Sequence, residues 1–292
     1  MSQLFQVNQI DVEELVNFSE KNPWKPQYPK PLVRRFLTEL ISNQNLVFDF
    51  HDQKGRVSAA VLLDKVNNPA NDACLEVLGL RSDTEPSEIL SRFFALAKEK
   101  APRNRSGFQV GLPEDTSVSS ELLKQHGLNH YYDTFEMLQS NLQFAPRSDS
   151  DEIVNATNDD VDEVYKVLCE SFAKNPDTSI PEIDTWKAGF LKSPKSHFFL
   201  WREADKILGF ATLVEGEGGH ETEIRTIGVL AEHRGKGIGQ NLLNYCLNKS
   251  LDFGFKHCHL TVAVTNKKAL DLYLRAGFKI TEKFMCYRVE LQ

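Results

Sequence analysis

The sequence predicts an α/β protein made of two similar halves, each a β-sheet with helices on both faces. The length of 292 residues suits two domains better than one. Apolar residues recur at helical spacing in some stretches and alternate with polar residues, as in strands, in others. Helices come first, then three strands, then alternating helices and strands, and this order occurs twice along the chain.

A domain boundary is expected near the middle of the chain. The stretch LQFAPRSDSD combines a proline with serines and aspartates after a run that resembles a strand. We therefore expect a first domain at residues 1–141, a linker at residues 142–150 and a second domain at residues 151–292. The acidic residues between 149 and 163 predict a solvated linker and a first helical turn, where carboxylates suit the helix dipole.

The elements of the second half follow from the spacing of its apolar residues. Gly237–Phe253 carries them along one helical face, whereas they alternate in His257–Val264, and Gly277 is typical of a helix end. In chain order we expect helices at 159–173 and 181–192, strands at 197–202, 207–215 and 223–230, a helix at 237–253, a strand at 257–264, a helix at 266–276 and a strand at 284–291.

The first half repeats this order. We expect helices at 11–21 and 31–43, strands at 46–51, 56–64 and 73–80, a helix at 86–100, a strand at 107–112, a helix at 119–126 and a strand at 132–139. Similar segments support a duplication: LLKQHGL and LYLRAGF place their glycines, Gly127 and Gly277, 150 residues apart. The alternative is a coincidence between two common α/β patterns.

Composition excludes several classes of protein. A net charge of −7 argues against a nucleic-acid binder that relies on bulk charge. No stretch approaches the roughly 18 apolar residues of a membrane span, and the first residues lack the pattern of a secretory signal. Five scattered cysteines without a C-x-x-C pair predict neither a disulfide framework nor a metal site. A cytoplasmic protein is expected.

The first chemical motif is a glycine-rich turn between an expected strand and an expected helix. The strand EIRTIGVL leads through AEH into Arg234-Gly235-Lys236-Gly237-Ile238-Gly239. Glycines let the backbone approach a ligand, and the free N–H groups of a helix start attract an anion. Arg234 and Lys236 add charge suited to phosphate. The spacing matches neither a Walker A motif nor a dinucleotide fingerprint.

The second motif lies one strand later, from Asn266 to Phe278. Together, R-x-x-G-x-G after a strand and N-x-x-A-x-x-L-Y-x-x-x-G-F resemble the GNAT N-acetyltransferase superfamily, over about residues 151–292. The resemblance implies two tandem GNAT-like domains, each a mixed, splayed sheet. It also implies that acetyl-CoA binds between the parallel strands 223–230 and 257–264.

By this resemblance, backbone N–H groups of the glycine-rich turn hold the pyrophosphate of acetyl-CoA, and the edge of a strand pairs with its pantetheine arm. Tyr273 matches the family tyrosine that protonates the departing thiolate, although a core aromatic on a helix would have the same spacing. Asn266 is either a helix N-cap or a contact at the cofactor. The expected cofactor-binding residues are Ile227, Val229, Arg234, Gly235, Lys236, Gly237, Ile238, Gly239, Gln240 and Asn266.

A general base is also expected, because an alkyl ammonium with a pKa near 10.4 is only about 0.1% free amine at pH 7. Glu223 is the first candidate, and Glu221 and His220 are alternatives. The acidic position found nearer the strand's middle in some relatives is Arg225 here, which leaves the identity of the base open. Glu215, Glu217, Glu221 and Glu223 also place four carboxylates close together, either to attract a cationic acceptor or as plain surface.

The first half of the chain lacks these two motifs. Where the phosphate loop should lie, it has Arg81–Glu88, without glycine and with three acids, which would repel pyrophosphate. At the offset of 150 residues, Tyr273 aligns with Leu123 and Asn266 with Thr116. This half therefore resembles a degenerate GNAT domain.

The predicted function is direct transfer of an acetyl group from acetyl-CoA to an amine. The acceptor would be an amine-bearing small molecule or peptide, with no metal, nucleic acid or membrane involved. A first alternative is a non-catalytic acyl-CoA-binding or sensor protein, against which Tyr273 argues. A second is a structural pseudo-enzyme, against which the intact R-x-x-G-x-G argues.

Overall fold

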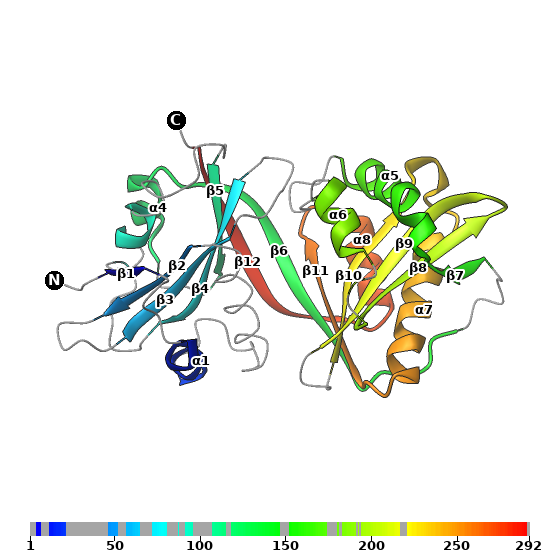
Figure 1. Ribbon diagram of the computed structural model, residues 1–292, viewed down its shortest axis with the longest axis horizontal. Coiled ribbons are helices and arrows are strands. Elements are labelled where there is room, and N and C mark those ends of the chain that lie inside the picture. Colours follow the sequence, from blue (N-terminus) through cyan, green and yellow to red (C-terminus); the bar gives the residue numbers. More distant parts are fainter. Residues whose placement is uncertain are drawn as a thin grey trace. The chain divides into compact units, whose positions relative to one another are not determined.

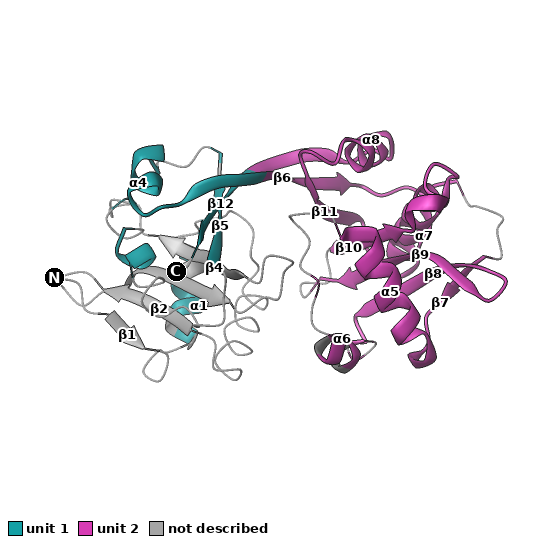
Figure 2. Ribbon diagram, turned by 90° about the horizontal axis from the view of Figure 1, so that it is seen from above, with its two compact units in different colours: residues 1–132, 284–292 teal, residues 133–283 magenta. Residues whose placement is uncertain are grey.

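The computed structural model divides into two compact units, residues 1–132 with 284–292 and residues 133–283 (Figure 2). Both contain mixed β-sheet and helices, which confirms the α/β class. The structure describes residues 4–6, 12–21, 46–51, 57–64, 72–80, 87, 91–95, 107–114, 118–146, 152–173, 180, 183–190, 192, 194–216 and 221–290. The helix expected at 31–43 lies outside them.

The first unit contains the strands β1 to β5, the last part of β12 and the helices α1 and α4. Its strand order is β1-β2-β3-β4-β5-β12, antiparallel throughout except for the parallel pair β4–β5. The bounds are β1 Leu4–Gln6, α1 Val12–Lys21, β2 Leu46–His51, β3 Val57–Asp64, β4 Asp72–Leu80, β5 Gly107–Pro113, α4 Ser120–Gln125 and β12 Lys279–Glu290.

The second unit has the strand order β6-β11-β10-β9-β8-β7, in which only β10 and β11 run parallel among the pairs described (Figure 1). The bounds are β6 Asn129–Ser140, β7 Ile153–Asn155, α5 Val161–Phe172, α6 Ile183–Gly189, β8 Ser196–Glu203, β9 Lys206–Glu215, β10 Glu221–Val229, α7 Ile238–Asp252, β11 His257–Ala263 and α8 Lys267–Arg275. The edge strand β7 falls in the acidic stretch where a linker and a helical turn were expected.

Two strands pair in the unit that is formed mainly by the other half of the chain. The compact units therefore differ from the linear domains expected at 1–141 and 151–292. Residues 134–140 of β6, from the first half of the chain, pair with β11 in the second unit. Residues 284–290 of β12, from the second half, pair with β5 in the first unit. Each unit therefore completes its sheet with a strand from the other half.

The expected linker begins as a packed segment. Leu142 is buried, and its N–H donates to Lys256 O at 2.9 Å. Asn248 of α7 accepts from Ala145 N at 2.8 Å and donates to Ala145 O at 3.2 Å. These bonds hold residues 142–146 against the rest of the second unit.

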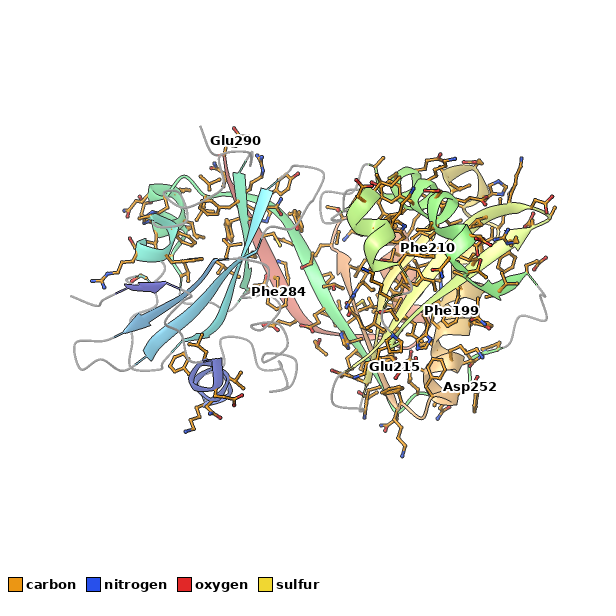
Figure 3. The ribbon with its side chains drawn as sticks, in the orientation of Figure 1. Phe199, Phe210, Glu215, Asp252, Phe284 and Glu290 are labelled. Atoms are coloured by element: carbon orange, nitrogen blue, oxygen red, sulfur yellow. The ribbon has the colours of Figure 1, made fainter. Side chains whose placement is uncertain are left out.

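Helices cover both faces of the second unit's sheet, as expected (Figures 1 and 3). Strand β8 shows that both faces are covered, because its successive apolar side chains point to opposite faces and are buried on each. Phe198 and Leu200 pack with α5 and α6, whereas Phe199 and Trp201 pack in the cluster that contains α7 and α8. This packing holds α5 and α7, the two helices that have one end next to β10.

Strands β10 and β11 separate after a short parallel stretch, and this fork positions the site. Glu221–Glu223 pair with His257–His259, and no pairing between the two strands follows in their described residues. On its other edge β10 stays paired with β9 as far as Val229, with a bulge at Arg225. The edge of β10 beyond the fork is therefore not used by β11.

The start of α5 depends on Asp160. Its Oδ2 accepts from Thr157 N at 2.7 Å and from Thr157 Oγ1 at 2.9 Å, and its Oδ1 accepts from Arg202 of β8. Partial burial raises the pKa of this carboxyl, but the hydrogen bonds from Thr157 and Arg202 outweigh burial and hold the pKa below its usual value. Folding therefore favours the ionised form.

We expect Asp160→Asn to lower the free energy of unfolding by about 1–2 kcal/mol at pH 7, as loss of a helix cap does. Because the pKa is lower in the folded state, this stabilisation is present above the unfolded pKa of about 3.9. It is lost as the pH falls through the lower, folded value. Urea unfolding at pH 7 and pH 3 measures both. The exposed neighbour Asp159 supplies the control, since Asp159→Asn removes an equal charge and should leave stability nearly unchanged.

Candidate active site

A glycine-rich loop joins β10 to α7 and has the conformation expected of an anion site. Gly235 and Gly237 have φ angles of 80° and 87°, which other residues rarely adopt. Gly237 is the N-cap of α7, and its carbonyl accepts the first helical hydrogen bond, from Asn241 N at 3.0 Å. No described side chain caps this helix start, and its first turn has no acidic residue. Its N–H groups are therefore available to a ligand.

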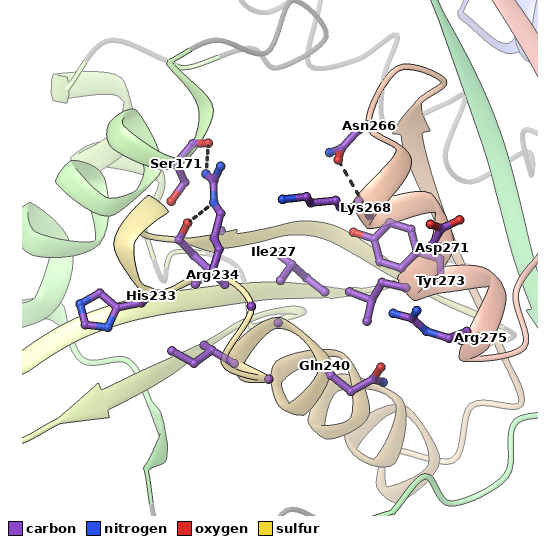
Figure 4. A pocket seen from close by; sticks show the side chains of 18 of the residues that line it. Ser171, Ile227, His233, Arg234, Gln240, Asn266, Lys268, Asp271, Tyr273 and Arg275 are labelled. Carbon is purple, nitrogen blue, oxygen red and sulfur yellow. Dashed lines mark hydrogen bonds between the residues drawn. The ribbon is translucent and has the colours of Figure 1, made fainter.

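The loop borders a pocket with a volume of about 560 Å³, ordinary for a small-molecule site (Figure 4). Its walls are Ile227–Val229, residues 233–235 and 237–240, one face of α8 and the end of α5. Ser171 of α5 lines it, and the buried Ser171 Oγ has no hydrogen-bond partner among the described residues. A free hydroxyl and free N–H groups around one pocket fit a ligand rich in oxygen acceptors.

The two cations of the loop have different positions. Arg234 lines the pocket, but its Nε donates to Val229 O and its Nη2 to Ser171 O, both at 2.9 Å. The guanidinium thus joins the end of β10 to the end of α5 and keeps other N–H groups for a ligand. Lys236 is exposed and lies outside the pocket wall.

The open edge of β10 supplies a second binding element. Ile227 and Val229 line the pocket and lie beyond the fork, where β11 no longer pairs with β10. An extended ligand that carries amide groups can add to such an edge as a further strand would. The two expected edge residues therefore line the pocket at the open edge of β10.

Tyr273 is a core residue that also lines the pocket. It is 8% exposed, belongs to the core cluster and packs edge-on against Phe278, with ring centroids 6.0 Å apart. It also lines the pocket, and its hydroxyl points toward the space in front of the glycine loop (Figure 4). Asn266 likewise lines the pocket and caps α8, since its Oδ1 accepts from Ala269 N at 3.3 Å. The helix cap sets the start of the helix that carries Tyr273.

The pocket is also lined by two cations that were not predicted from the sequence. Lys268 and Arg275 extend from α8 toward the glycine loop and α7 (Figure 4). The signal was present in the spacing, because residues 268, 271, 272 and 275 lie on one helical face and all of them line the pocket. The pocket therefore presents cations from two sides.

Three of the four carboxylates expected near the acceptor lie within the described residues, and each is close to a basic side chain. Glu223 Oε2 accepts from Arg225 Nη2 at 2.9 Å. His197 Nε2 lies 2.8 Å from Glu215 Oε1, and His259 Nδ1 lies 3.8 Å from Glu221 Oε2. None of the three carboxylates lines the pocket described above. Glu217 and His220 lie outside the described residues.

Two buried thiols, Cys246 and Cys258, are poor candidates for the nucleophile of a covalent acyl-enzyme. Burial raises the pKa of Cys258 to about 12, and burial together with Cys258 raises the pKa of Cys246. Neither thiol forms the nucleophilic thiolate readily.

The described part of the chain contains no group of three or more His, Cys, Asp or Glu side chains that could hold a metal ion. None of its helices is long and apolar enough to span a membrane. In the loop expected to replace the phosphate site of the first half, Arg81–Glu88, only Ser87 is among the described residues.

Comparisons with known proteins find similarity to acetyltransferases. The family model described as the acetyltransferase (GNAT) family matches residues 161–278. N-alpha-acetyltransferase 50 of Danio rerio is 42% identical over 60 residues, which are 20% of this chain and 36% of that protein. Aminoalkylphosphonate N-acetyltransferase of Salmonella typhimurium is 27% identical over 135 residues, 44% of this chain and 84% of that protein. The first of these matches thus spans about a third of its relative.

Solved structures share the fold of the chain. A GCN5-related N-acetyltransferase from Sphaerobacter thermophilus has a TM-score of 0.76 at 18% identity and covers 100% of this chain and 96% of its own. A tandem GNAT protein from the clavulanic acid biosynthesis pathway has a TM-score of 0.65 at 11% identity, with 100% and 99% covered. Identities this low show a shared fold alone.

The matched residues are the ones that build the site. Residues 161–278 run from α5 through the fork of β10 and β11 to the end of α8, and they include the glycine loop, the pocket and Tyr273. Residues 161–278 of this chain belong to the acetyltransferase (GNAT) family.

Proposed function

We propose that residues 151–292 transfer an acetyl group from acetyl-CoA directly to the nitrogen of an amine. The observation that carries the proposal is one pocket bordered by the uncapped start of α7, the open edge of β10 and Tyr273. The names of the two relatives support the reaction type, since both are N-acetyltransferases. The acceptor would be an amine-bearing small molecule or peptide.

In this proposal the residues of the chain bind acetyl-CoA and move protons. The N–H groups of residues 235–240 receive the pyrophosphate, and Lys268 and Arg275 add positive charge. The backbone of Ile227–Val229 pairs with the amides of the pantetheine arm. Tyr273 donates a proton to the departing thiolate. Acetyl-CoA itself supplies the activated thioester.

We further propose that the first half of the chain is a second GNAT-like domain that binds no acetyl-CoA. Its support is the topology, because β1-β2-β3-β4-β5-β12 and β7-β8-β9-β10-β11-β6 have the same directions of pairing. In both strand orders the fourth neighbouring pair, β4–β5 or β10–β11, is the parallel one. The acidic loop at Arg81–Glu88 supports the lack of a cofactor.

Calorimetry with acetyl-CoA and a thiol-release assay with a panel of amines test the proposal together. We expect one acetyl-CoA per chain, and CoA release that depends on at least one amine. Binding without release by any amine would favour the acyl-CoA sensor. No binding would reject the proposal, and two acetyl-CoA per chain would reject the assignment of the first half.

A further inference from the structure

Strand β10 connects a group of charged side chains, Glu221, Glu223 and Arg225, to the pocket. It begins beside β11 with Glu221 and Glu223, passes the bulge at Arg225 and ends with Ile227–Val229 in the pocket wall. Glu221 and Glu223 therefore lie at the closed side of the fork, a few residues before the part of β10 that lines the pocket.

His259 has an unusual position at this fork. It is directly opposite Glu223 in the last pair before the strands separate. Its Nδ1 is buried without a hydrogen-bond partner among the described residues, while 30% of the side chain is exposed. The exposed part thus belongs to other atoms of the side chain. The carboxylate of Glu221 lies 3.8 Å from the buried Nδ1, on the neighbouring strand.

The neighbouring charges separate His259 from Glu223 as a proton acceptor. One oxygen of Glu223 already accepts from Arg225 at 2.9 Å, whereas Nδ1 of His259 has no hydrogen-bond partner among the described residues. His259 faces Glu221 and Glu223 on β10, Leu138 on β6 and His257 on its own strand. Glu136 of β6 lies one step further along the same face, opposite Thr261.

We propose that His259 takes the proton of the acceptor ammonium and that Glu221 positions its ring. This rests on the proposed function and gives the reaction the base that the sequence left open. With a proton on Nδ1 directed at Glu221, Nε2 is left as the basic nitrogen. Glu221 is then a positioning residue, and His259 is the group that contacts the acceptor.

Each bond change in this proposal is accompanied by a proton transfer. The ammonium gives one proton to Nε2 of His259, and the free amine forms the C–N bond as the C–S bond breaks. The thiolate takes a proton from the Tyr273 hydroxyl. The second proton lost by the nitrogen, as the amide forms, replaces the one that Tyr273 gave. His259 returns its proton to solvent.

The first test requires no substrate. Nitrogen-15 NMR of the histidine rings, with the signal of His259 assigned by its loss in His259→Gln, reports which nitrogen carries the proton. We expect the Nδ1–H form in the unliganded protein and a shift toward the Nε2–H form in Glu221→Gln. His257→Gln, two residues earlier on the same strand, should leave the His259 signal unchanged. An Nε2–H ring in the wild type, or no change in Glu221→Gln, would overturn the pairing.

The second test measures kcat/KM for an amine from the panel against pH. We expect His259→Gln to lower it about 10²-fold at pH 7, with the acetyl-CoA Kd unchanged. The variant should then gain about tenfold per pH unit up to the amine pKa, because only free amine reacts, whereas the wild type should depend on pH less steeply. His257→Gln should behave as the wild type.

The outcomes distinguish the two proposals. Wild-type turnover with a normal His259→Gln profile would reject His259 alone, and a loss in Glu223→Gln would assign the role to that carboxylate instead. A wild type that binds acetyl-CoA and acetylates no amine would reject the proposed function and, with it, any proton transfer by His259.

Discussion

Gly239→Glu is expected to weaken acetyl-CoA binding about 100-fold, or about 2.8 kcal/mol. Gly239 is in the first turn of α7 and lines the pocket. The new carboxylate would lie beside the proposed pyrophosphate site, and two unit charges about 5 Å apart near a protein surface repel by roughly 3 kcal/mol. Calorimetry with acetyl-CoA measures the effect directly.

The position suits this test because a side chain fits there. A Cβ at Gly239 would meet Val229 Cγ2 at 3.8 Å and Leu272 Cδ2 at 3.9 Å, both ordinary contacts. At Gly237, by contrast, the φ of 87° would strain any substitution and mix folding with binding. Gly239→Glu should therefore fold, and a carboxylate near a helix start favours the helix.

Gly239→Gln is the matched control, since it adds a side chain of the same size without charge. We expect it to weaken binding about tenfold or less, so the difference between the two variants isolates the electrostatic repulsion. Equal losses would show that bulk alone acts at this position. Unchanged acetyl-CoA binding in a folded Gly239→Glu variant would show that the pyrophosphate binds elsewhere. It would thereby remove the basis of the proposed function.

Local signals in the sequence were enough to predict the second motif. The N-cap Asn266, the positive φ of 97° at Gly277 and the apolar face with Leu270 and Tyr273 are all set within one helix and its ends. The glycine loop was equally readable, because positive φ angles and a strand-to-helix turn depend on neighbours in the chain. Those parts of the candidate site therefore follow from the sequence.

The strand exchange could not be predicted in the same way. The alternation in β6 and β12 indicates strands, but no local signal says which edge each strand will join. Residues 134–140 pair with residues more than a hundred positions later in the chain, and 284–290 pair with residues far earlier. Pairing partners of this kind are chosen by non-local packing, which one sequence does not reveal.

The charged residues of the site divide in the same way, into those that local spacing predicts and those that depend on the folded chain. Lys268 and Arg275 share a helical face with two other pocket residues, so their position was readable from spacing. The link between His259 and Glu221 depends instead on the register of β10 against β11. The two carbonyl partners of Arg234 likewise come from the ends of β10 and α5, which only the folded chain brings together.

Tyr273→Phe should lower kcat about 10²-fold and leave the acetyl-CoA Kd nearly unchanged. Phenylalanine keeps the ring that packs in the core against Phe278 and removes only the hydroxyl directed into the pocket. Stability should therefore change little. Loss of a positioned general acid typically lowers a rate 10²–10⁴-fold. The low end is expected here, because a phenol is ordinarily a weaker acid than a thiol by about 1.5 pKa units.

Single-turnover kinetics make this measurement decisive, since product release does not enter them. Tyr245→Phe provides the control: Tyr245 of α7 packs against Phe199, with ring centroids 4.9 Å apart, and lies outside the pocket wall. It loses the same oxygen atom from a partly buried ring and should keep the wild-type rate. If both variants kept that rate, the position of Tyr273 would be explained by packing alone. If kcat fell only in Tyr273→Phe, with equal acetyl-CoA affinity in both, the lost group would act on the reaction rather than on binding, as a proton donor to the thiolate requires.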